Sequence, residues 1–135
     1  MAEQPPVQPP PQAPPPAATG SGMTPPVAGL VAYLLGWIGG LIVIVMEKEN
    51  REVKFFGWQA IALDVSAVVA FFALFIVGVI FAIAVPPLGG LLIFIAYLAL
   101  LGDGILHIVL AVQAYQGHAT RVPLIGDWAA KQAGI

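Results

Sequence analysis

Long apolar stretches dominate this chain, and short polar segments separate them. The apolar stretches cover residues 27–46, 55–85 and 88–115. At a rise of ~1.5 Å per residue, about twenty helical residues span the ~30 Å hydrocarbon core of a bilayer. The pattern therefore predicts an all-α integral membrane protein, a bundle of three transmembrane helices over about 27–46, 57–85 and 88–116.

The second and third stretches are predicted to form a helical hairpin. Pro86 and Pro87 separate them, and proline cannot continue a helix. Gly89 and Gly90 follow and favour a tight turn. After residue 116 we expect a short segment at the membrane interface, so that residues 27–135 make up one membrane domain.

Residues 1–26 form a proline-rich tail. They hold ten of the thirteen prolines and a single charged residue, Glu3. Such a segment cannot bury a core, so we expect a disordered tail with polyproline II character. The absence of Arg or Lys beside the prolines favours a semi-rigid spacer over a ligand for a proline-binding domain.

Composition agrees with a membrane protein. Hydrophobic residues make up 59% of the chain and charged residues 9%, whereas a soluble domain carries roughly 25% charged residues. The net charge of −2 and the lack of a long basic run argue against a nucleic-acid partner. The lack of cysteine excludes thiolate metal sites and cysteine nucleophiles.

No catalytic sequence motif is present. The chain has no GxSxG, no P-loop and no dinucleotide fingerprint. We therefore expect a protein that is not an enzyme and holds no cofactor. The expected partners are the lipid bilayer and either further copies of the chain or other membrane proteins.

The basic residues predict an orientation. All five lie in two polar segments, with Lys48, Arg51 and Lys54 after the first stretch and Arg121 and Lys131 after the third. Cytoplasmic segments are enriched in Lys and Arg. With three crossings, this bias predicts a multi-pass protein of the plasma membrane with its N-terminus outside and its C-terminus in the cytoplasm.

Small residues recur at intervals of four and predict close helix packing, because small side chains let helix backbones approach each other in lipid. Packing of the first helix on the second explains this pattern, and a homodimer face is the alternative. The residues are Ala28, Ala32, Gly36 and Gly40 in the first stretch and Ala62, Ser66 and Ala70 in the second.

Three ionisable residues lie within the apolar stretches. Asp103 and His107 are four residues apart, so they share a helix face. In an antiparallel hairpin Asp64 falls at a similar depth, with Gln59 and Gln113 nearer the cytoplasmic end. The arrangement predicts either a polar pocket that opens to the cytoplasm or polar contacts that hold the helices together.

A metal site is not expected from these residues. Asp103 and His107 offer two ligands, but the chain has no HExxH motif and no third histidine within reach. His118 lies in the segment that follows the third stretch.

Several short motifs resemble a known family. They are the Tyr33-Leu34-Leu35-Gly36 run, Glu47-Lys48-Glu49-Asn50, Phe55-Phe56-Gly57-Trp58-Gln59-Ala60, Ala114-Tyr115-Gln116-Gly117 and Pro123-Leu124-Ile125-Gly126-Asp127. Over about residues 28–130 the chain resembles small prokaryotic membrane proteins described as Tic-twenty-like, after a chloroplast inner-envelope import component. The resemblance implies a role related to protein import and supplies no catalytic residues.

Two hypotheses for function follow. The first is a non-enzymatic structural or assembly protein of the membrane, related to protein translocation through the resemblance. The alternative is a small oligomeric channel or transporter that uses the ionisable pocket of Asp64, Asp103 and His107.

Overall fold

The computed structural model describes residues 3–7, 9–11 and 22–135. Every regular element in these residues is a helix, which confirms the all-α class. The order is α1 (Pro25–Leu34), α2 (Gly36–Met46), α3 (Arg51–Ala84), α4 (Pro86–Tyr115) and α5 (Ile125–Ala133). Residues 3–7 and 9–11 have no helix or strand, and the rest of the predicted disordered tail up to residue 21 lies outside the described residues.

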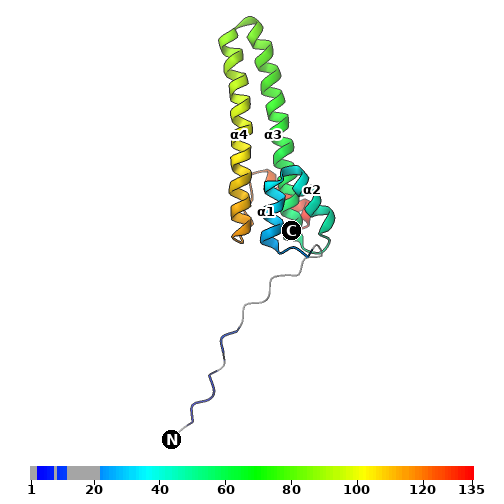
Figure 1. Ribbon diagram of the computed structural model, residues 1–135, viewed down its shortest axis with the longest axis vertical. Coiled ribbons are helices and arrows are strands. Elements are labelled where there is room, and N and C mark those ends of the chain that lie inside the picture. The colour runs from blue at the N-terminus through cyan, green and yellow to red at the C-terminus, as the bar shows by residue number, and fades with distance from the viewer. Residues whose placement is uncertain (1–2, 8, 12–21) are drawn as a thin grey trace.

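The long helices α3 and α4 form the expected hairpin (Figure 1). Asn50 caps α3, because its side-chain oxygen accepts hydrogen bonds from the backbone N–H groups of Glu52 at 3.0 Å and Val53 at 3.3 Å. Val85 alone separates the two helices. The predicted turn at Gly89 and Gly90 is therefore wrong, because α4 begins at Pro86, where proline fits the first turn of a helix, and includes both glycines. Gly89 is needed beyond the turn, because a Cβ atom there would overlap the backbone of Ala82.

Only α3 and α4 are long and apolar enough to cross a membrane among the described residues. Their 34 and 30 residues correspond to ~51 and ~45 Å. Both exceed the ~30 Å core, so the hairpin must tilt or project beyond it. Large apolar side chains such as Phe72, Ile80 and Leu101 are exposed along both helices, as expected for surfaces that face lipid.

The first apolar stretch does not form one helix, so the predicted transmembrane helix over 27–46 is wrong. The chain reverses at Gly36, whose φ of +61° is open to glycine but strained for other residues. Helices α1 and α2 have only 10 and 11 residues, or ~15 and ~17 Å. We call them the folded-back pair.

Neighbours along the folded-back pair show its path. Gly29 in α1 lies against Phe56 and Ala114, near the start of α3 and the end of α4. The turn at Gly36 reaches Asp64, eight residues further along α3 than Phe56, which is ~12 Å. Helix α2 then returns, because Gly40 lies against the carbonyl of Gly57.

The reversal also corrects the predicted placement of the chain ends on opposite sides. That prediction depended on three crossings. In the structure the beginning of α1 and the end of α4 lie at the same end of the hairpin, together with α5 and the C-terminus (Figure 1).

The predicted small-residue stripe divides into three environments. Ala28 and Ala32 are fully buried, and Gly40 is buried against α3. Gly36 forms the turn and does not provide a packing surface for another helix. The small residues of α3 pack less than expected. Ala62 and the exposed Ser66 line a groove beneath α5, and Ala70 is exposed.

The C-terminal segment packs on α3 near the beginning of that helix. The ring of Trp128 meets that of Trp58 edge to face at 5.9 Å between centroids. Nη1 of Arg51 donates a hydrogen bond to the carbonyl of Gly134 at 3.1 Å. Ala129, Ala130 and Ala133 are buried. The C-terminal segment therefore covers the start of α3, at the end of the hairpin where the basic residues lie.

The folded-back pair can be tested by single cysteines, because the chain has none of its own. We expect Thr24→Cys and Gln116→Cys, both at exposed positions, to react with a membrane-impermeant maleimide from the same side of sealed vesicles. Gly90→Cys, which has open space around it, should react only from the other side. Labelling of residues 24 and 116 from opposite sides would contradict the reversal at Gly36.

Candidate functional site

The structure brings Asp64, Asp103 and His107 together, and we call these residues the acid–histidine cluster. Asp64 comes from α3 and the other two from adjacent turns of α4. Nδ1 of His107 lies 3.5 Å from Oδ2 of Asp103, and Nε2 lies 3.7 Å from Oδ1 of Asp64. One potential ligand atom from each residue lies within 4.8 Å of the others. Asp64, which the sequence placed at this depth, thus offers a third potential ligand atom, whereas the sequence analysis counted only those of Asp103 and His107.

Asp64 also holds the turn of the folded-back pair. Its Oδ2 accepts a hydrogen bond from the backbone N–H of Trp37. That N–H belongs to the first turn of α2, where the N–H groups have no partner within the helix and the helix dipole favours negative charge. Gly36 leaves room for the carboxylate, because a Cβ atom there would overlap it. The carboxylate therefore caps α2 from a different helix.

His107 is nearly inaccessible, with 6% of its surface exposed. Its Nδ1 lies 3.1 Å from the backbone carbonyl oxygen of Asp103. A carbonyl can only accept, so Nδ1 carries a proton in this contact. In a neutral ring the lone pair then belongs to Nε2, which is buried and has no hydrogen-bond partner.

The cluster lies in a pocket of about 410 Å³. The turn of the folded-back pair forms one wall through Leu34, Leu35 and Gly36. The edge of the Tyr33 ring packs against the His107 ring at 6.3 Å between centroids. The reversal of the chain at this depth therefore supplies one wall of the pocket.

Gln59 and Gln113, predicted at the mouth of this pocket, do not line it. Gln59 is fully buried and joins three segments. Its Nε2 donates to the hydroxyl of Tyr33 at 2.8 Å and the carbonyl of Thr120 at 2.9 Å, and its Oε1 accepts from the N–H of Val122 at 3.1 Å. Gln113 has a buried Oε1 without a hydrogen-bond partner.

Sequence reasoning missed the contributions of Tyr33 and of the backbone near Thr120. The one available signal for Tyr33 was a hydroxyl within an apolar stretch, since a buried tyrosine hydroxyl usually finds a partner. No sequence signal marks a backbone carbonyl such as that of Thr120.

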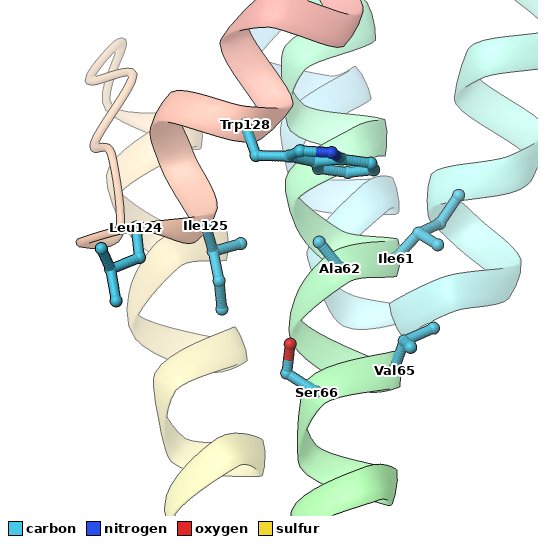
Figure 2. A pocket seen from close by; sticks show the side chains of 7 residues that line it. All are labelled: Ile61, Ala62, Val65, Ser66, Leu124, Ile125 and Trp128. Carbon is cyan, nitrogen blue, oxygen red and sulfur yellow. The ribbon is translucent and has the colours of Figure 1, made fainter.

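A second pocket of about 400 Å³ lies between α3 and the C-terminal segment. Figure 2 shows Ile125 and Trp128 facing the side of α3 that carries Ala62 and Ser66. No ionisable side chain lines it. Such an apolar groove suits contact with lipid chains or other apolar groups, and it offers no acid, base or metal ligand for catalysis.

Comparison with known proteins identifies relatives. The profile of the MamF/MmsF magnetosome magnetite crystal formation protein family matches residues 18–129. A UPF0132 membrane protein of Methanocaldococcus jannaschii is 34% identical over 109 residues, which is 81% of this chain and 88% of the relative. One from Archaeoglobus fulgidus is 33% identical over 112 residues, 83% of this chain and 98% of the relative. No solved structure matches significantly.

Fold, site and relatives together define a helical membrane protein with an acid–histidine cluster between its long helices. The chain belongs to the MamF/MmsF magnetosome magnetite crystal formation family, because the profile of that family matches residues 18–129. The resemblance to the Tic-twenty-like family is therefore wrong, because the match covers the residues that carried it and no relative found points to that family. The protein-import role that it implied has no support.

We predict that Gln59→Leu loosens the C-terminal segment. The change leaves the Tyr33 hydroxyl and two backbone groups without their partner, at a cost of about 1–3 kcal/mol for each group that stays buried. Trypsin should then cleave after Arg121 much faster than in the unchanged protein in lipid nanodiscs. Gln116→Leu, at an exposed position, is the matched control. Equal cleavage rates for the two variants would show that Gln59 does not hold the segment.

Proposed function

We propose that this protein is a non-enzymatic membrane protein that binds a cation in its acid–histidine cluster. The observation that carries the proposal is the contact of two carboxyl groups with one buried imidazole. Two carboxylates flank one imidazole, and their only ion-pair contacts among the described residues are with that imidazole. When both carboxyl groups are ionised and the imidazole is neutral, the site carries two negative charges in a medium where uncompensated charge is costly. A cation would offset that cost.

The description of the family supports a cation as the ligand. It names magnetite crystal formation, and magnetite is an iron oxide. This description fits a membrane protein that binds a metal ion, and the carboxyl and imidazole groups of the cluster are metal ligands.

We propose that the end carrying the cluster faces the cytoplasm of a plasma-membrane protein. The basic residues Lys48, Arg51, Lys54, Arg121 and Lys131 all belong to segments at that end of the hairpin (Figure 1), and Lys and Arg are enriched on the cytoplasmic side. Both the start of α1 and the C-terminus would then be cytoplasmic. Thr24→Cys should label only after the cells are permeabilised, and labelling of intact cells would reverse the orientation.

A structural or assembly role is the second candidate, and the bond between Asp64 and Trp37 favours it. In that role the cluster would tie α2, α3 and α4 together without a ligand, and lipids, further copies or other membrane proteins would be the partners. A channel or transporter would need several copies, because two spanning helices do not enclose a path. Crosslinking in native membranes would reveal whether such copies associate.

Cation binding should appear as stabilisation of the folded protein. We expect at least one of Na⁺, Mg²⁺, Ca²⁺, Mn²⁺, Co²⁺ or Zn²⁺ to raise the Tm of the full chain in nanodiscs. The gain is ~2.7 kcal/mol at a concentration one hundred times the Kd. Asp103→Asn should abolish the increase, whereas Asp127→Asn, at an exposed position outside the cluster, should retain it. Tm values that no cation changes would favour the structural role.

A further inference from the structure

We infer that the acid–histidine cluster is a site for a divalent first-row transition-metal ion, held by Nε2 of His107 and by one oxygen each from Asp64 and Asp103. This inference rests on the proposed function and adds the class of ligand. It uses one further observation, the hydrogen bond of His107, which determines which ring nitrogen is available to a metal.

The hydrogen bond of His107 fixes which nitrogen of a neutral ring is available to a metal. Because Nδ1 donates to the carbonyl oxygen of Asp103, a neutral ring presents its lone pair at Nε2. A ligand histidine in a metal site commonly donates its other ring N–H in this way, which fixes the ring orientation and the tautomer. The ring is therefore already positioned as a metal ligand would be.

Nε2 lies near another oxygen with lone pairs. Oδ1 of Asp64 is 3.7 Å away, and Nε2 has no hydrogen-bond partner although the side chain of His107 is only 8% exposed. When the imidazole is neutral, these two electron-rich atoms repel each other unless a positive species lies between them. A metal ion between the two atoms removes this repulsion, as a proton on Nε2 would, and bonds to both atoms.

The spacing suits a transition metal. Bonds of ~2.0–2.2 Å from a metal to histidine nitrogen and carboxylate oxygen allow two ligand atoms to lie up to ~4.2 Å apart, so the 3.7 Å gap needs no movement of the helices. One ligand atom from each of the three residues lies within 4.8 Å of the others. The Asp103 carboxylate contacts Nδ1 of His107 at 3.5 Å, so it would move toward Nε2 on binding the same metal ion.

The donor set identifies the class of metal. Imidazole suits Zn²⁺, Fe²⁺, Co²⁺, Ni²⁺ and Cu²⁺, whereas Mg²⁺ and Ca²⁺ prefer oxygen ligands throughout. The chain has no cysteine that would favour softer ions. Three protein ligands in a pocket of about 410 Å³ leave positions for water or for a second donor. Such a site keeps an open coordination position, unlike a closed structural site with four protein ligands.

Cobalt is a suitable probe because its ligand-field absorption reports its coordination directly. We expect the full chain in nanodiscs to bind one Co²⁺, with Zn²⁺ competing and Mg²⁺ not competing. His107→Gln should weaken Co²⁺ binding by at least about 10-fold, since loss of even an outer partner of a metal ligand costs 10–100-fold. His118→Gln, an exposed histidine outside the cluster, is the matched control and should bind as the unchanged protein does.

Three results would separate the possible failures. Equal Co²⁺ affinity in His107→Gln and His118→Gln would overturn the assignment of His107. Stabilisation by Na⁺, Mg²⁺ or Ca²⁺ without Co²⁺ binding would overturn the metal class and leave the proposed function standing. No response to any cation would contradict both. Helix content by circular dichroism without metal, together with Asp103→Asn as a second variant, distinguishes lost binding from lost folding.

Discussion

The hydrogen bond from the backbone N–H of Trp37 to the carboxylate of Asp64 is the contact on which the rest of the structure depends. Within a membrane, a backbone N–H without a partner costs several kcal/mol. A chain that reverses inside the apolar region exposes such groups at the start of its second helix. Asp64 supplies the missing acceptor, and Gly36 supplies both the positive φ and the space for the carboxylate.

The same carboxylate links folding to the candidate site. One oxygen of Asp64 caps α2 while the other faces His107. Asp64 therefore has a structural role that persists without any ligand, and its replacement would disturb both functions at once. Asp103 contributes its side chain only to the cluster among the contacts described for it, which makes it the better position for separating binding from folding.

The sequence predicted the α3–α4 hairpin and the common depth of Asp64, Asp103 and His107, because prolines and helical spacing determine both. It did not reveal the reversal at Gly36. An apolar stretch of twenty residues suits one crossing helix as well as two half-length helices. The hydropathy of the stretch does not show whether the chain reverses within it. Small residues at every fourth position fit a straight helix too, so a glycine that forms a turn looked like a packing glycine.

The motifs that suggested the wrong family have a related explanation. Gly36 and Gly117 both adopt positive φ, at the turn of the folded-back pair and after α4. Residues of this kind mark where helices end, a requirement that unrelated small membrane proteins share. The role of Gln59 was misjudged because two of its three partners are backbone groups brought near by the C-terminal segment.

The most direct test of the central claim, that the folded-back pair builds the site, is the distance between spin labels at the start of α1 and at the end of α4. Gly29 lies against Ala114 in the structure, so labels on Thr24→Cys and Gln116→Cys, both at exposed positions, should lie close together at the same end of the hairpin (Figure 1). A straight helix continuing from Gly40, which lies against Gly57, would instead place residue 24 ~24 Å beyond Gly57 along α3. A label at residue 24 that lies closer to one on Gly90→Cys than to one on Gln116→Cys would contradict the folded-back pair and the site that it encloses.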